Sequence, residues 1–311
     1  MDMSRPSLRV TPMVAALLLA GLTAAGCGSA GPDGPPSPSA DAVAGDRAGA
    51  VVAAWHEGDL LARWRSSFVP AQGLTVEPDW TPRGHLKAAF YGGWVRTAAP
   101  LPDVAGTGTV TYAAGPRPLE VRTVGADTAY REMVNPRAGE CPPPEGGTGC
   151  GWLTITGATL RTATVATARG SATVPVWAFA VQGLAEPLLR VAVEPAAEVS
   201  DFEPELPPLT ATGSLGLASG QDVVRAEGSR LTVRVGIGSC DGEPVAHVTE
   251  TADLVVVGAT VALPTGDMAC DAMLNLRELS VQLDAPLGDR PVLDLASGRP
   301  LLPAVPLPGQ G

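Results

Sequence analysis

The sequence predicts a mainly β fold of the β-rich α+β kind, with two β-sheet domains and one or two short helices near the N-terminus. Apolar residues alternate with polar ones in residues 231–237 and again in residues 279–283, a period typical of half-buried strands. Residues 109–112 and 119–124 flank a Gly/Pro turn and indicate a hairpin. A proline-rich acidic stretch, residues 194–213, then separates the two parts of the chain.

Two helices are expected in the first part. Asp46 can cap a helix in which apolar side chains recur at four-residue spacing: Val51 and Trp55, then Leu60, Trp64 and Phe68. Gly58 is expected to divide this helix in two. Its aromatic residues are interpreted as core residues, with a ligand-binding set of aromatic residues as the alternative. A second helix is expected over Asp127–Met133, with Asp127 as its cap.

The remaining β-rich runs are expected to be strands: residues 153–167, 172–181, 188–193, 245–249, 254–257 and 291–295. Pro175 cannot donate a hydrogen bond to a ladder, so its strand should lie at an edge or carry a bulge. Leu254–Val257 is continuously apolar and should be buried on both faces.

These patterns predict a division of the chain into six segments: a signal peptide (1–26), a flexible tether (27–46), an N-terminal β-rich domain with helices (47–200), a Pro/acidic linker (201–213), a C-terminal β domain (214–302) and a disordered tail (303–311). The tether is rich in Gly, Pro, Ser, Ala and Asp, and such a composition buries too little apolar surface to fold.

The N-terminus has the layout of a secretory signal peptide. Arg5 and Arg9 precede an uncharged apolar run, Met13–Leu22, and small residues lead to Cys27. The run is shorter than the ~20 residues of a membrane span, so a permanent transmembrane anchor is disfavoured.

Ala24-Ala25-Gly26-Cys27 resembles the lipobox of bacterial lipoproteins. The resemblance implies that Cys27 receives a diacylglyceryl group after the leader is removed, which would hold the protein on the extracytoplasmic face of the cell membrane. The match departs at Ala24, where the family usually has leucine. Simple secretion is the alternative.

The other four cysteines are Cys141, Cys150, Cys240 and Cys270, and exported proteins keep such residues as disulfides. Four cysteines allow three connectivities, of which nearest-neighbour pairing is the simplest. Their spacing lacks the close pairs of structural zinc sites.

Three further segments, residues 174–181, 249–253 and 283–290, resemble pieces of uncharacterised secreted lipoproteins of high-GC Gram-positive bacteria. This resemblance implies export and a lipid anchor. It implies no activity, and no functional residue is carried over from it.

The sequence offers little catalytic chemistry. The net charge of −11 argues against nucleic acid as a partner. The chain has no Gly-x-Ser-x-Gly elbow and no phosphate-binding glycine loop with lysine. His56, His85 and His247 lack metal-ligand spacing and are interpreted as structural, so no metal and no cofactor are expected.

Glu250 and Asp253 are the weak catalytic candidates, because two close carboxylates can serve as general acid and base. The alternative is a turn in which they accept backbone hydrogen bonds. Arg290 is expected to pair with a nearby carboxylate and fix the turn around residues 285–290, with a ligand-binding arginine as the alternative. Asp267 and Asp271 flank Cys270, but the pattern of a calcium loop is absent.

Two function classes follow from the sequence. The favoured one is a lipid-anchored binding or interaction module of the cell envelope, with an envelope protein, a wall polymer or a small solute as its partner. The other is a cell-wall-directed hydrolase with a carboxylate-based site. The absence of a strong nucleophile, metal or cofactor motif favours binding over catalysis.

Overall fold

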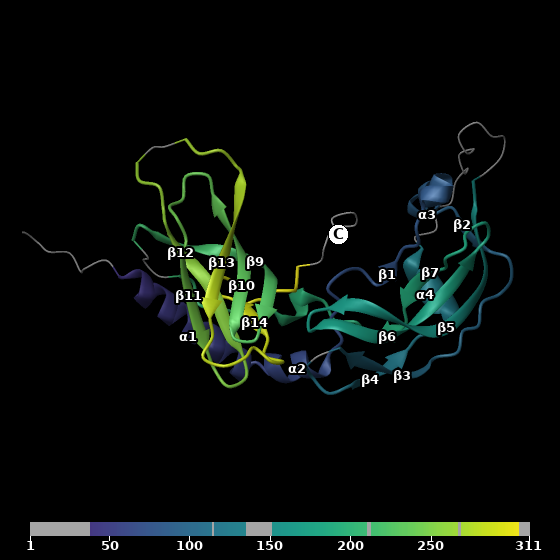
Figure 1. Cartoon of the computed structure of the whole chain (residues 1–311), viewed down its shortest axis with the longest axis horizontal. Helices are drawn as coiled ribbons and strands as arrows, with labels where there is room; N and C mark the ends of the chain where they lie inside the picture. Colours follow the sequence, from purple (N-terminus) through teal and green to yellow (C-terminus); the bar gives the residue numbers. More distant parts are fainter. Residues whose placement is uncertain (1–37, 114, 135–150, 210–212, 267–268, 305–311) are drawn as a thin grey trace, which may run out of the picture. The chain divides into compact units, whose positions relative to one another are not determined.

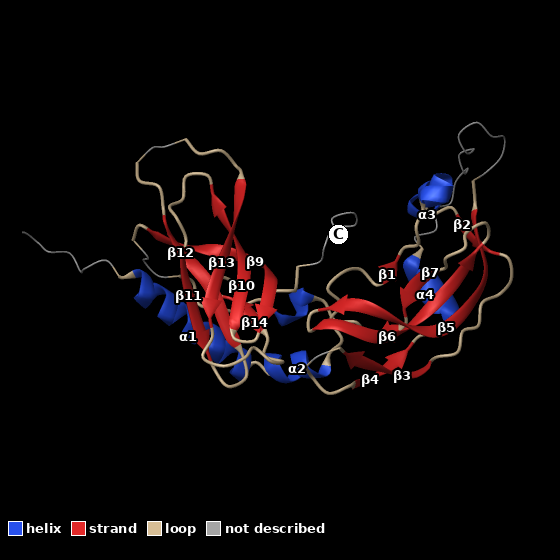
Figure 2. Cartoon of the chain, viewed as in Figure 1, coloured by secondary structure: helices blue, strands red, loops and turns tan. Residues whose placement is uncertain are grey.

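The computed structural model describes residues 38–113, 115–134, 151–209, 213–266 and 269–304. Within these ranges the chain is mainly β, with two curled, largely antiparallel sheets and four α-helices (Figure 1, Figure 2). The β-rich two-sheet fold class predicted from the sequence is therefore confirmed.

The helices are α1 (Ala40–Glu57), α2 (Leu60–Ser66), α3 (Gly84–Gly92) and α4 (Ala126–Met133), with short 3₁₀ turns at Thr81–Arg83 and Val199–Phe202. Helix α1 begins six residues before Asp46, and the side chain of Ser39 caps it by accepting a hydrogen bond from the Ala42 N–H. The predicted cap was therefore wrong, and residues 40–46 are helical rather than part of a tether. Val43 and Ala44 are buried there. The Ala/Gly-rich composition of this segment does not indicate that burial.

The predicted division of the first helix is confirmed. Gly58 and Asp59 separate α1 from α2, and Asp59 adopts a left-handed backbone with φ of 54°. Trp55 and Trp64 are buried as core residues. Phe68 is buried too, but it lies beyond the end of α2.

The other two helices differ in part from expectation. Helix α4 covers the predicted range, although Gly125 rather than Asp127 occupies its N-cap position. Helix α3 was not predicted, because Gly84 and Gly92 at its ends weaken a short helical pattern.

The first sheet contains eight strands within the described residues: β1 (Thr75–Val76), β2 (Val95–Thr97), β3 (Gly106–Tyr112), β4 (Leu119–Thr123), β5 (Leu153–Thr167), β6 (Gly170–Val181), β7 (Leu188–Val191) and β8 (Val193–Glu194). The predicted β3–β4 hairpin is confirmed. Strands β5 and β6 form a long hairpin with Thr167 opposite Gly170. Strand β6 pairs on its other side with β3 near one end and with β7 near the other.

The edge-or-bulge prediction for Pro175 was wrong. Strand β6 is interior, and its ladder with β5 is regular at Pro175. The carbonyl of Pro175 accepts a hydrogen bond from Ala192, on the side away from β5. Backbone N–H and C=O of one strand residue point to the same side. The missing N–H of Pro175 therefore faces the gap between the β3 and β7 pairings, where no ladder bond is lost.

The second sheet contains six strands within the described residues: β9 (Leu215–Glu227), β10 (Arg230–Gly238), β11 (Val245–Glu250), β12 (Val255–Ala262), β13 (Leu274–Gln282) and β14 (Val292–Asp294). Strand β12 pairs with β11, β9 and β14 and is buried, as its apolar run predicts. The four alternating apolar residues of β10 are also buried. Strand β9 was not predicted.

Cys240 and Cys270 form a disulfide with an S–S distance of 2.03 Å. Cys240 follows β10 and Cys270 precedes β13, and these two strands pair with each other. The bridge therefore links the ends of neighbouring strands, as nearest-neighbour pairing predicts. Cys27, Cys141 and Cys150 lie outside the described residues.

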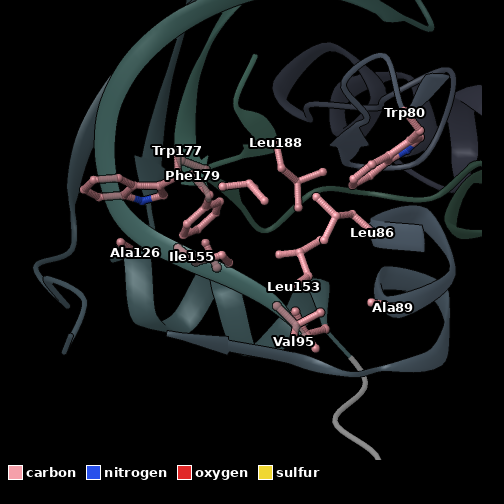
Figure 3. Packing of buried hydrophobic residues seen from close by; sticks show 14 of the residues in the cluster. Trp80, Leu86, Ala89, Val95, Ala126, Leu153, Ile155, Trp177, Phe179 and Leu188 are labelled. Atoms are coloured by element: carbon pink, nitrogen blue, oxygen red, sulfur yellow. The ribbon is translucent and has the colours of Figure 1, made fainter. Parts of the chain in front are cut away.

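Buried clusters form against each sheet. One joins α3 with β5, β6 and β7 through Leu86, Leu153, Phe179 and Leu188 (Figure 3). A second cluster packs α1 and α2 on β12 and β14, and it also contains Phe202 from the expected linker. Its members include Trp55, Trp64, Leu254, Val256, Leu293 and Leu295. The domain boundaries remain a prediction, but these helices bury their apolar faces against the second sheet.

Candidate functional site

Glu250, the last residue of β11, is held by two partners. Its Oε2 accepts a hydrogen bond of 2.9 Å from Arg290 Nη1, and its Oε1 accepts one of 2.6 Å from the backbone N–H of Asp284. Burial raises the pKa of Glu250, but these hydrogen bonds outweigh it and the pKa lies below its ordinary value. Because such a carboxyl is ionised at neutral pH, Glu250 carries no proton to donate as a general acid.

Asp253 lies in the turn between β11 and β12 and has partners of its own. Its Oδ1 accepts a hydrogen bond of 2.9 Å from the Thr251 hydroxyl and lies 3.2 Å from His56 Nε2, while Arg65 is 4.0 Å from Oδ2. Burial raises the pKa of Asp253, and the hydrogen bonds from Thr251 and His56 lower it further than burial raises it. The geometry of both carboxylates supports the turn-fixing interpretation.

Arg290 fixes the loop of residues 285–290. A guanidinium has five N–H donors, and the structure provides five acceptors at 2.9–3.1 Å: the Glu250 carboxylate and the backbone oxygens of Thr251, Ala285, Pro286 and Leu287. Arg290 therefore has no donor left for a ligand. The prediction that it pairs with a carboxylate to fix this turn is confirmed.

A cavity of about 510 Å³ lies beside this loop. Its walls come from the β5–β6 turn, strand β9, residues 286–292 and the segment that contains Leu301. Most of the lining is apolar and includes Val223, Leu287 and Val292. The volume is typical of small-molecule sites, which span about 300–1,000 Å³.

Arg169 enters this cavity from a tight turn. It is one of the two residues that join β5 to β6. The buried Thr167 hydroxyl donates to the Gly170 carbonyl at 2.7 Å and accepts from the Arg169 N–H at 3.1 Å. Gly170 has a φ of 90°, a conformation that favours glycine. Ala168, the other turn residue, donates its N–H to the carbonyl of Val69 at 2.9 Å. The backbone that carries Arg169 is thus held on both sides.

The Arg169 guanidinium lies over two aromatic rings. Its central carbon lies 5.8 Å from the ring centre of Trp64 and 5.6 Å from that of Tyr112. Burial lowers the pKa of Arg169, and electrostatic interactions with Tyr112 and with Asp289, which also lines the cavity, oppose that effect. The faces of these aromatic rings stabilise the cation. They offer no in-plane hydrogen-bond acceptor to the N–H groups of the guanidinium.

Two side-chain donors of residues that line this cavity have no partner among the described residues. Arg169 Nη2 and Trp64 Nε1 make no hydrogen bond there, and both atoms are enclosed by the protein with almost no accessible surface. Buried polar groups are almost always paired, and an unpaired one costs about 1–3 kcal/mol. Arg169 as a whole is only half-buried, so its side chain is the cationic group of this pair that a ligand in the cavity can reach.

The sequence does not reveal this site. In it, Arg169-Gly170 indicates only the end of a strand, and Trp64 is interpreted as a core residue rather than as part of a ligand-binding set of aromatic residues. No local pattern distinguishes an arginine in a two-residue turn that faces solvent from one that faces a cavity, because the other walls come from residues more than fifty positions away.

The remaining candidates have structural partners or stand apart. His247 Nε2 lies 2.9 Å from the Thr260 hydroxyl and His247 Nδ1 lies 3.5 Å from Asp41. His85 is exposed on α3. The carboxylate of Asp271 accepts a hydrogen bond from the Met273 N–H, and Asp267 lies outside the described residues. Among the residues that the structure describes, no group of three or more His, Cys, Asp or Glu is placed to hold a metal ion.

Comparison with protein-family models, curated proteins and solved structures finds no match to this chain. In the described part of the chain, no helix combines the length and the apolar character needed to cross a bilayer. The chemistry of the cavity is therefore the basis for a functional proposal.

Proposed function

We propose that this protein is a lipid-anchored extracytoplasmic binding protein that holds a small ligand in the cavity around Arg169. The observation that carries the proposal is the half-buried side chain of Arg169, which lines a cavity of about 510 Å³ and forms no ion pair among the described residues. A negative group on a bound ligand would compensate the charge of Arg169.

Binding accounts for these observations better than catalysis does. The carboxylates that the sequence offered for a hydrolase, Glu250 and Asp253, are paired and have lowered pKa values. A general acid needs a pKa near the working pH. No observation on the described residues favours the hydrolase alternative.

The anchor rests on the leader and on Cys27. A signal-peptide layout that ends in a small-residue stretch before cysteine supports export and lipidation. Two acyl chains on one residue hold a protein stably on a membrane, whereas one does not.

Cell fractionation tests the anchor. The wild-type chain should stay with the membrane, and Cys27→Ala should appear in the culture medium. Membrane retention of Cys27→Ala at the wild-type level would contradict the lipid anchor.

Native mass spectrometry of the released Cys27→Ala chain tests binding. The chain should carry a small molecule that is retained much less when Arg169→Gln is added. Arg161→Gln is the matched control, because it removes the same charge from an exposed position on β5. Spectra with no bound molecule, or with retention that is equal in the two double variants, would contradict the proposal.

A further inference from the structure

The ligand class can be narrowed from the groups that line the cavity. The guanidinium of Arg169 is a donor only and accepts no hydrogen bond. The ligand group that meets it must therefore supply acceptors. Two acceptor atoms on one group suit an arginine particularly well, because its planar fork binds a carboxylate through parallel hydrogen bonds.

The charge balance favours an anion. Arg169 is half-buried and forms no ion pair among the described residues. A cation removed from water without a counter-ion is costly. A ligand with a negative group would compensate this charge directly.

The same cavity favours one negative charge over two. Of the other arginines in its lining, Arg290 is saturated by Glu250 and backbone oxygens, and Arg225 lies 3.8 Å from the carboxylate of Glu227. Asp289 is an exposed carboxylate in the lining and would repel a second negative charge. A carboxylate monoanion meets these conditions, and a phosphate dianion does not.

The rest of the lining sets the body of the ligand. Val223, Leu287, Val292 and Leu301 present aliphatic surface, and Pro286, Pro291 and Pro303 extend it. Apolar ligand surface is stabilised against such walls. The body that matches them is hydrocarbon.

We propose that the cavity binds an aliphatic carboxylic acid as its anion, with the carboxylate on the Arg169 guanidinium and the hydrocarbon chain against the aliphatic walls. This inference rests on the proposed binding function. It assigns Arg169 as the charge receptor.

Isothermal titration calorimetry of the released Cys27→Ala chain tests it with three probes that share one chain length: decanoate, 1-decanol and decyl phosphate, each kept monomeric. Decanoate should bind more tightly than the other two. Arg169→Gln should weaken decanoate binding about tenfold to hundredfold, as expected for a hydrogen-bonded charge. Arg161→Gln, on the exposed face of the same hairpin, should leave it unchanged.

A second variant guards against misfolding of Arg169→Gln. Arg169→Lys keeps the positive charge at this position and removes the planar fork of donors. It should retain more of the decanoate affinity than Arg169→Gln does and leave 1-decanol binding unchanged. Circular dichroism and thermal unfolding confirm that each variant is folded.

The other outcomes separate the inference from the proposed function. Equal binding of decanoate and 1-decanol, without dependence on Arg169, overturns the carboxylate assignment while a binding cavity remains. Tighter, Arg169-dependent binding of decyl phosphate overturns the choice of a monoanion. If no probe binds, the inference is wrong, and the binding function is then decided by the native mass spectra.

Discussion

Two neighbouring tryptophans provide a sharp test of the structure. Trp55 and Trp64 belong to one buried cluster, are 0% and 2% exposed, and have ring centres 6.1 Å apart. The Nε1 of Trp55 donates a hydrogen bond of 2.8 Å to the Gly298 carbonyl, whereas that of Trp64 has no partner among the described residues. Substitution by phenylalanine removes the same atoms at both positions.

The two substitutions should therefore differ mainly in the hydrogen bond. The loss of buried surface is similar at the two sites, because both side chains are almost fully buried in one cluster. Trp55→Phe also leaves the carbonyl of Gly298 without its donor, which costs about 1–3 kcal/mol. Trp64→Phe removes a donor that is already unpaired and weakens the cation–π contact with Arg169 by less than about 1 kcal/mol. We expect Trp55→Phe to lower the free energy of unfolding by about 1–3 kcal/mol more than Trp64→Phe does.

Urea unfolding at fixed pH, without added ligand, measures this difference. Trp177→Phe is a control from the first sheet, because the Nε1 of Trp177 donates to the Val124 carbonyl at 2.8 Å. It should behave like Trp55→Phe. A loss of stability in Trp64→Phe as large as that in Trp55→Phe would refute the assignment of an unpaired donor at Trp64.

Three further predictions concern stability. Glu250→Gln should lower the free energy of unfolding by about 1–3 kcal/mol at pH 7. Because the pKa of Glu250 in the folded protein is lowered, this contribution is present above the ordinary glutamate pKa and disappears as the pH falls through the folded value. A stability difference between wild type and variant that stays constant in acid would count against this pairing. Replacing Cys240 and Cys270 by serine opens a link across 30 residues and should cost about 3–4 kcal/mol in urea unfolding; an unchanged midpoint would be inconsistent with a bridge. Gly170→Ala should lower the free energy of unfolding by about 1–2 kcal/mol, because φ there is 90° although nothing lies within 4 Å of the new methyl group. Gly157→Ala also has nothing within 4 Å of the new methyl group but has no positive φ, so it should lower stability less in thermal unfolding. The reverse order would contradict the turn geometry.

Much of the sheet structure could be predicted because it depends on local periodicity. The alternation in residues 231–237 reports which side chains face the core, and β10 buries those residues. The break at Gly58 and the position of Cys240 and Cys270 beside paired strands are also local signals. Strand β9 was missed because its glycines and charged residues interrupt the alternation.

Other features depend on contacts that no local pattern encodes. The start of α1 at Ala40 was missed because small residues such as Ala44 and Ala48 become apolar contacts only when a sheet covers them. The pairing of Pro175 was missed because the neighbouring strands change along β6, and only the assembled sheet shows where the gap between them falls.

The sequence by itself determined the β-rich fold class, most of the strands, one disulfide and the expectation of an exported, anchored chain. Those conclusions follow from periods, spacings and short motifs that each lie within a few tens of residues. The tertiary structure decided that Glu250 and Asp253 are paired, and it brought Arg169 beside Trp64 in a cavity with β9 and Leu301. Such a site is created by long-range packing, because its donors are left unpaired only when segments distant in sequence enclose them without supplying an acceptor.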